Sequence, residues 1–143
     1  MSKTRELLPV EQEIISLFYP KNKRKRIRYE LSKVDLNNQD SISDFQWRNM
    51  NDIGHFNLKN FHAEKAYPSK TELRELAGNT SVYYMGCHYY GWLSAEEAWE
   101  KAFESDVCLI YLGNGVAWYQ GEQFSTNGIG AAPERFMLTV KKG

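Results

Sequence analysis

Residues 81–120 read SVYYMGCHYYGWLSAEEAWEKAFESDVCLIYLGNGVAWYQ, and this stretch decides the fold. Ten of the twenty aromatic residues of the chain lie within it, between Tyr83 and Tyr119. Aromatic side chains bury a larger area per residue than most others. We therefore expect the hydrophobic core to be centred on this segment.

A helix is predicted to begin after Ser94. Ser94 and Glu97 have the spacing of a capping box, in which each side chain satisfies a backbone N–H of the first turn. Small and aromatic residues then recur at helical spacing along one side: Ala95, Ala98, Trp99, Ala102 and Phe103. Because alanine is small, this side favours close packing of the helix on a sheet.

Strands are predicted on both sides of this helix. Val82–Met85 is the first, followed by an aromatic-rich connection over residues 86–93. The continuous apolar run 107–112 is typical of a strand that is buried on both faces. The turn Gly113–Gly115 favours the positive φ angles of a tight hairpin, so residues 116–120 should return antiparallel.

Two further helices are predicted, over residues 9–18 and 69–78. Apolar residues recur at helical spacing in the first, and Pro20 ends it. In the second, Ser69 and Glu72 again have capping-box spacing. Its expected inner face consists of Leu73, Leu76 and Ala77.

Residues 21–36 are predicted to form a basic loop followed by a strand. Ile27, Tyr29 and Leu31 alternate with polar residues, which is the pattern of a half-buried strand, with a bulge near Ser32. The first part of this segment, residues 21–28, holds six of the eighteen basic residues of the chain. The predicted basic surface consists of Lys21, Lys23, Arg24, Lys25, Arg26 and Arg28.

The segment 37–68 is expected to hold one or two strands, the clearer one around 55–59. With a last strand over 135–141, the chain is predicted to be a single α+β domain, 1–143. We expect a mixed or antiparallel sheet with about three short helices packed mainly on one face. The two main parts are then the basic loop-strand 21–36 and the helix-strand-hairpin core 81–120.

Composition restricts the class of protein. The formal net charge is zero, which argues against a uniformly basic or acidic protein. The two cysteines form no disulfide framework. No signal-peptide pattern is present, and no run approaches the roughly 20 apolar residues of a membrane span. These features predict a cytoplasmic protein that does not contact a membrane.

The basic run supports the first functional hypothesis. Clustered lysine and arginine side chains attract phosphate, and the neighbouring Tyr19 and Tyr29 offer rings that stack on bases. The run is therefore a candidate binding site for nucleic acid or another polyanion. The alternative is a solvated loop whose charges serve solubility.

The aromatic connection supports the second hypothesis. Strand alternation sends some of its rings outward, and exposed Tyr and Trp side chains anchor protein interfaces. The candidate interface residues are Tyr83, Tyr84, Tyr89, Tyr90 and Trp92. If a helix layer covers the second face of the sheet, these rings belong to the core instead.

Three histidines support an enzymatic alternative. His55, His62 or His88 with a basic residue supply the groups for RNA cleavage or nucleotide processing: an acid, a base and a charge that stabilises the phosphate. Their spacing matches no catalytic motif. Most single histidines are simply hydrogen-bonded or exposed.

No metal site or cofactor is predicted. Cys87 and His88 are adjacent, so on a strand they point to opposite faces, and Cys108 lies in an apolar run typical of a small buried side chain. The glycine-rich stretch 121–134 lacks the Lys-Ser/Thr of a phosphate-binding loop. It is interpreted as a connection long enough to bind a partner.

Together these patterns favour a non-enzymatic binding protein. Its partner would be another protein, a nucleic acid or both. Small domains of this kind occur among inhibitor, immunity and accessory proteins of phages and other mobile elements, an analogy of size alone. The sequence gives neither the identity of the partner nor the oligomeric state.

Overall fold

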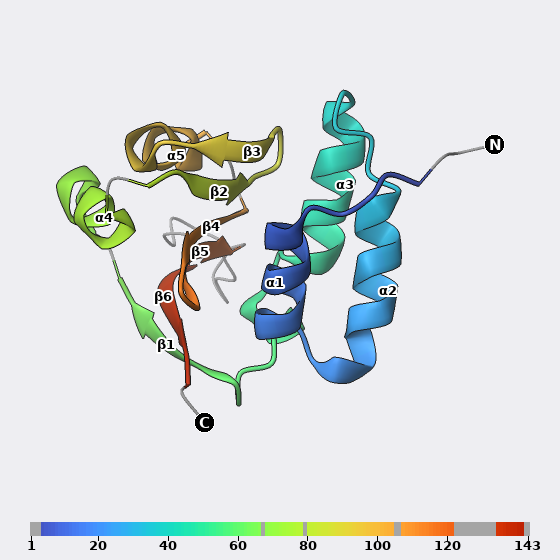
Figure 1. Ribbon diagram of the computed structural model, residues 1–143, viewed down its shortest axis with the longest axis horizontal. Helices are drawn as coiled ribbons and strands as arrows, with labels where there is room; N and C mark the ends of the chain where they lie inside the picture. The colour runs from blue at the N-terminus through green and yellow to red at the C-terminus, as the bar shows by residue number, and fades with distance from the viewer. Residues whose placement is uncertain (1–3, 67, 79, 105–106, 122–133, 142–143) are drawn as a thin grey trace, which may run out of the picture.

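The computed structural model describes residues 4–66, 68–78, 80–104, 107–121 and 134–141 (Figure 1). The helices in these ranges are α1 (Pro9–Phe18), α2 (Lys21–Ser32), α3 (Gln39–Asn49), the 3-10 helix η1 (Ile53–His55), α4 (Lys70–Ala77) and α5 (Ala95–Ala102). The strands are β1 (Phe61–Lys65), β2 (Val82–Met85), β3 (Tyr90–Leu93), β4 (Cys108–Gly113), β5 (Val116–Gly121) and β6 (Glu134–Val140). The predicted α+β class is confirmed.

One antiparallel sheet joins all six described strands, in the order β1-β6-β5-β4-β2-β3. The predicted hairpin joins β4 to β5, and its turn residues Asn114 and Gly115 have φ of 53° and 76°. β6 follows β5 in the chain and inserts between β5 and β1. The two edge strands are therefore β1 and β3.

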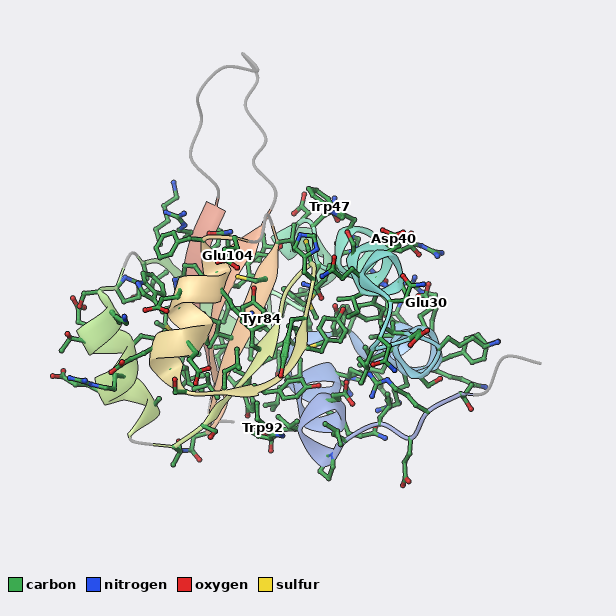
Figure 2. The ribbon with its side chains drawn as sticks, turned by 90° about the horizontal axis from the view of Figure 1, so that it is seen from above. Glu30, Asp40, Trp47, Tyr84, Trp92 and Glu104 are labelled. Carbon is green, nitrogen blue, oxygen red and sulfur yellow. The ribbon has the colours of Figure 1, made fainter. Side chains whose placement is uncertain are left out.

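Helices cover both faces of the sheet, as the view in Figure 2 shows. Alternate residues of β5 make the division clear, because Ala117 and Tyr119 contact the layer of α1, α2 and α3, whereas Trp118 contacts the layer of α4 and α5. The described chain thus has five α-helices in two layers. About three helices were expected, because residues 21–32 were interpreted as a loop and strand and α3 was missed. They were expected mainly on one face, because parity along a strand does not reveal how many faces are covered.

Rings fill the space under α1. Phe18 packs edge-on against Phe61 at 5.4 Å, and Phe56 packs edge-on against Tyr119 at 5.2 Å between ring centroids. Edge-to-face pairs of this kind add to the energy of burial. The aromatic residues of β5 and β1 are thereby joined to the first helix.

Buried hydrogen bonds attach α3 to the sheet. Gln46 is fully buried, and its Nε2 donates to Met85 O at 3.0 Å and Val107 O at 3.2 Å. Its Oε1 accepts from the Tyr90 hydroxyl at 2.8 Å. The amide is therefore satisfied through three contacts, which fix the position of α3 over β2 and β4.

A second buried polar group holds the N-terminal segment. The carboxylate of Glu11 is fully buried and receives two bonds from the Arg5 guanidinium, at 2.9 and 2.6 Å. The Leu8 N–H and the Tyr83 hydroxyl also donate to it, at 2.8 and 3.2 Å. Four donors compensate the charge, because a buried carboxylate without partners costs several kcal/mol.

The α4–α5 layer is simpler. Ala95, Ala98 and Ala102 are buried against the sheet, as their spacing predicts, and Trp99 packs on Trp118 at 5.0 Å. Ser69 and Ser94 accept from the Glu72 and Glu97 N–H groups, which is the serine half of each predicted capping box. Two residues of the predicted inner faces, Leu76 and Phe103, are exposed instead, because they lie at the margins of these short helices.

The largest correction concerns residues 21–36, which form helix α2 over Lys21–Ser32 and not a loop and strand. Ile27 and Leu31 are buried but Tyr29 is 58% exposed. A spacing of four residues fits both an alternating strand and one side of a helix. The interpretation as a strand was wrong because it assigned Tyr29 to the buried side.

The segment 37–68 also differs from the prediction. It contains α3, which was missed, and its one described strand lies at Phe61–Lys65 instead of 55–59. α3 buries Ile42, Phe45, Gln46 and Asn49, so two of its four inward positions are polar and mask the apolar period. In addition, the predicted connection 86–93 contains strand β3.

Candidate functional site

Helix α2 carries the candidate site. It begins directly after Pro20, and its inner side is formed by Ile27 and Leu31, one turn apart and both about 1% exposed. The α2 sequence contains six basic residues and one acidic residue, whereas the rest of the chain contains twelve basic and seventeen acidic residues. The neutral total thus conceals a strongly positive helix on a negative body.

Three of the basic side chains of α2 bond to neighbouring groups. The Nε of Arg24 donates to Tyr19 O at 3.0 Å, and the Nε of Arg28 donates to the Gln12 amide oxygen on α1 at 3.2 Å. Arg26 pairs with Glu30 at 3.0 Å, one helical turn away. These contacts orient the arginines, but only Arg26 is paired with a negative charge.

The lysines differ from the arginines. Within the described ranges, no carboxylate pairs with any of Lys21, Lys23 and Lys25. Lys21 and Lys25 are exposed and Lys23 is half-buried. Their charges are therefore available to an anion in solution.

Tyr29 occupies the centre of the outward side of α2. It lies on the opposite side from Ile27 and Leu31, and its ring is 58% exposed. Lys25 and Arg26 precede it by four and three residues, so both lie one turn away on the same side. The amine of Lys33, four residues later, lies 5.0 Å from the centroid of the ring.

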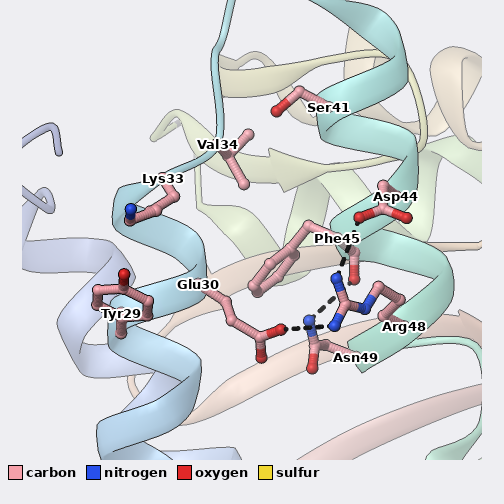
Figure 3. Close-up of a pocket in the computed structure, with 9 residues that line it drawn as sticks. All are labelled: Tyr29, Glu30, Lys33, Val34, Ser41, Asp44, Phe45, Arg48 and Asn49. Carbon is pink, nitrogen blue, oxygen red and sulfur yellow. Dashed lines mark hydrogen bonds and ion pairs between the residues drawn. The ribbon is translucent and has the colours of Figure 1, made fainter. Parts of the chain in front are cut away.

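A groove between α2 and α3 continues this surface (Figure 3). Its volume is about 310 Å³, and Tyr29 and Lys33 form one wall. On the other wall, Arg48 of α3 lies 3.4 Å from Glu30 and 3.4 Å from Asp44. The groove thus places the exposed ring of Tyr29 near two cations, Lys33 and Arg48, with the carboxylates of Glu30 and Asp44 in the same lining.

Tyr19, the other ring predicted beside the basic run, is not part of this surface. It is about 1% exposed, and its hydroxyl donates to Asn49 O at 2.8 Å. Burial raises the pKa of the hydroxyl far above its ordinary value. Tyr19 is therefore a core residue that joins α1 to α3.

Most of the proposed aromatic interface is also interior. Tyr83, Tyr84 and Tyr90 are at most 7% exposed, because one helix layer lies over each face of the sheet. Tyr89 is half-buried, with the amine of Lys101 at 5.2 Å from its ring centroid. These positions correct the expectation that the group faces outward.

Trp92 is the exception in this group. It is 52% exposed, and its ring packs edge-on against Tyr83 at 5.3 Å (Figure 2). The exposed tryptophan lies on the edge strand β3. It is the one member of the predicted set that still presents a large free surface.

Two of the three histidines, His62 and His88, lie far apart. His62 is on β1 and His88 follows β2, and these strands are separated by four strand-to-strand spacings, on the order of 19 Å. His55 belongs to η1, where its Nε2 lies 2.6 Å from the Asn51 side-chain oxygen. Burial and the nearby charge of Lys23 lower its pKa. The described geometry therefore does not join His62 and His88 in one acid–base pair.

The two cysteines lie in the core. Cys87 and Cys108 are buried free thiols, and burial raises the pKa of Cys108 well above its ordinary value. Over the described part of the chain, no three metal-ligating side chains come together. The glycine-rich stretch 121–134 lies almost wholly outside the described residues. Among the helices described, none is both long and apolar enough to cross a bilayer.

Sequence reasoning missed the buried polar groups Glu11 and Gln46 and the groove beside Arg48. The partners of Gln46 come from distant parts of the chain, as does the Tyr83 hydroxyl that bonds to Glu11, whereas Arg5 and Leu8 lie close to Glu11 in the sequence. Comparison with known proteins adds no assignment: no protein-family model, curated protein or solved structure matches this chain.

Proposed function

We propose that this protein binds single-stranded nucleic acid through the outward side of α2. The observation that carries the proposal is the exposed ring of Tyr29, with Lys25, Arg26 and Lys33 each within one helical turn. Aromatic rings stack on unpaired bases, while nearby cations neutralise the phosphates between them. A ring bordered by cations therefore suits a single strand better than a duplex, whose bases are already stacked.

The position of the charges supports the proposal further. Lys21, Lys23 and Arg24 lie in the first turn of α2, which contains no acidic residue. Cations at a helix N-terminus oppose the helix dipole at a cost of about 0.3–1 kcal/mol each. A sequence that keeps this unfavourable arrangement favours a role for the charges outside folding.

The other candidate surfaces are less suited to binding. Three of the five rings of the aromatic stretch are buried, so a protein interface there would depend on Trp92 and Tyr89. An RNA-cleaving site needs an acid and a base within reach of one phosphate, whereas His62 lies on β1 and His88 follows β2, four strand-to-strand spacings away in the sheet. Both hypotheses are therefore ranked below the α2 surface.

Fluorescence anisotropy with labelled single-stranded RNA and DNA oligonucleotides, and with a matched duplex, tests the proposal. We expect binding at low salt, with the duplex weaker. Because phosphate contacts release counterions, the logarithm of affinity should fall with the logarithm of salt concentration, with a slope of about −0.7 per phosphate contact.

Two variants separate charge from stacking. Lys21→Gln/Lys25→Gln should weaken binding by roughly tenfold at low salt and reduce the salt slope by about one to two. Tyr29→Ala should weaken binding by about 1–3 kcal/mol while leaving the salt slope unchanged, because it removes base stacking only.

The matched control is Lys59→Gln/Lys141→Gln, which removes the same charge at two exposed lysines outside α2. It should retain wild-type affinity. Equal losses in the control and in the α2 variant would attribute binding to net charge alone. No measurable binding of any oligonucleotide at low salt would reject the proposal.

A further inference from the structure

Strand β1 forms an open edge of the sheet (Figure 1). Among the described strands it pairs only with β6. Its residues His62, Ala63, Glu64 and Lys65 are all exposed, whereas Phe61 is buried. An exposed edge strand presents unpaired backbone groups and is a template for pairing with another chain.

The hydrogen-bond pattern tells which backbone groups face outward. Lys141 N donates to Asn60 O at 2.9 Å, and Ala66 N donates to Arg135 O at 3.2 Å. In an antiparallel ladder, hydrogen-bonded residues alternate with non-hydrogen-bonded ones. The even-numbered residues from 60 to 66 therefore bond to β6. It follows that Phe61, Ala63 and Lys65 point their N–H and C=O groups away from the sheet.

We propose that β1 pairs antiparallel with β1 of a second copy of this chain, with Ala63 on the two-fold axis. Ala63 then exchanges two hydrogen bonds with its own counterpart, and each Phe61 pairs with the opposite Lys65. Such an isologous contact closes after two subunits. It joins the two sheets into one.

Charge complementarity carries the proposal. In this register His62 lies opposite Glu64 of the second copy, and Glu64 opposite His62. Both pairs occupy non-hydrogen-bonded positions, where side chains approach most closely. An imidazole N–H donates to a carboxylate whether or not the ring is protonated. The sequence His-Ala-Glu is thus self-complementary about its central residue.

The neighbouring registers are worse. Pairing centred on His62 places the two imidazoles opposite each other, and pairing centred on Glu64 places the two carboxylates together. Like charges directly opposite destabilise a strand pair, which disfavours the register centred on Glu64. The register centred on His62 loses both imidazole–carboxylate contacts, because Glu64 then lies opposite Asn60. Both registers also form fewer pairs between the three outward-facing residues. Charge and hydrogen bonding therefore select the same register.

The usual role of charges on an edge strand is to prevent pairing. Lys65 would prevent pairing if it lay opposite another cation. In the proposed register it lies opposite Phe61, whose ring is buried, so its aliphatic stem covers the neighbouring strand while its amine stays in water. The edge is thus protected against most partners but not against a second copy of itself.

Sedimentation equilibrium of the full chain tests the proposal, with Ala63→Pro as the first variant. Proline removes an N–H that points away from β6, so every β1–β6 hydrogen bond remains. We expect the wild-type chain to dimerise reversibly. Ala63→Pro should raise the dissociation constant at least about tenfold, because two central hydrogen bonds are lost.

A charge exchange provides the second test and does not depend on the proline. His62→Glu places two carboxylates opposite each other twice per dimer and should weaken dimerisation about tenfold or more. The double variant His62→Glu/Glu64→Lys restores opposite charges and should return to within about threefold of wild type. His88→Glu, an equal change at an exposed histidine near the other edge, is the control and should have no effect.

A wild-type chain that stays monomeric at its highest soluble concentration would overturn the proposal. So would a dimer that Ala63→Pro and His62→Glu leave intact, or one that His88→Glu weakens equally. Circular dichroism and thermal melting establish that each variant is folded. None of these measurements depends on nucleic-acid binding.

Discussion

The two helical layers of this protein are held to one sheet by different means. On one face, α4 and α5 use side-chain caps, small buried alanines and ion pairs in solvent. On the other face, neither α1 nor α2 has a cap bond from its N-cap side chain, α3 has one from Asn38, and fully buried polar groups fix the layer. Glu11 and Gln46 together accept or donate seven hydrogen bonds there.

This difference explains which helices can be predicted from the sequence. Caps and an alanine stripe are local signals, so α5 is predicted from its own residues. Contacts such as Gln46 with Met85 join residues far apart in the chain and leave no local pattern. The α1–α3 layer should therefore be sensitive to loss of polar partners, and the α4–α5 layer should respond only modestly to surface changes.

The largest expected effect is a loss of stability at high pH, to which the α1–α3 face should contribute more than the α4–α5 face. Burial raises the pKa of four tyrosines on the α1–α3 face: Tyr19, Tyr83, Tyr90 and Tyr111, the last to about 12. The unfolded chain loses these protons first, near pH 10, so unfolding becomes more favourable as the pH rises further. Each tyrosine should lower the free energy of unfolding by about 1.4 kcal/mol between pH 8 and 11.

Urea titrations across this pH range measure the loss. Tyr83→Phe should reduce this pH-dependent loss by the contribution of one tyrosine, about 1.4 kcal/mol. The thiol of Cys108, on the other face, has a raised pKa as well and acts in the same direction. Cys108→Ala is therefore the variant to compare. A stability that does not change up to pH 11 would contradict the burial of these hydroxyls.

Gln46→Leu should have the next largest effect, about 3 kcal/mol of destabilisation. It removes three hydrogen bonds and leaves the buried hydroxyl of Tyr90 without that acceptor. Chemical denaturation measures the change. The double variant Gln46→Leu/Tyr90→Phe removes the hydroxyl as well and should recover about 1 kcal/mol. If the second change adds its full separate cost, the two side chains are not coupled.

Ser94→Ala should cost about 1 kcal/mol, because the Glu97 N–H loses its capping acceptor. The converse change in the other layer is Leu8→Ser, which gives the N-cap residue of α1 a hydroxyl that can accept from the first turn, a bond that Leu8 cannot make. Thermal melts should shift in opposite directions for the two variants. Equal destabilisation by both would show that the packing of Leu8 outweighs a cap.

Arg74→Gln should change stability least, by less than about 0.5 kcal/mol. It breaks the ion pair with Glu96 at 2.8 Å, whose two side chains are 53% and 44% exposed. Exposed pairs contribute little because water screens them. A loss above 1 kcal/mol in chemical denaturation would mean that the α4–α5 layer depends on this pair.

The extent of sequence prediction follows this division only in part, because α1 was predicted without a side-chain cap and α3 was missed although Asn38 caps it. α1, α4, α5, β2, the β4–β5 hairpin and β6 were predicted from caps, prolines, periodicity and turn residues. α2 was not, because Ile27 and Leu31 satisfy a strand and a helix equally. The interior position of Tyr84 was not decided either, since its strand faces a layer whose presence the strand does not encode.

The candidate site was predicted in composition but not in arrangement. The six basic residues and Tyr29 were identified from the sequence. Their distribution around α2 depends on the helical period, which was misassigned. The contribution of Arg48 depends on the packing of α3, whose inward positions include the polar Gln46 and Asn49. Contacts between side chains of separate helices and strands cannot be predicted from one segment of the sequence.

The place of β6 in the sheet also has a consequence for synthesis on the ribosome. β1 emerges early, but its partner in the ladder, from Phe61 opposite Val140 to Lys65 opposite Phe136, is made some seventy residues later. At about 5–20 residues per second, β1 waits for several seconds with both edges open. During that interval neither edge of β1 has its native partner, so the segment is open to pairing with another strand.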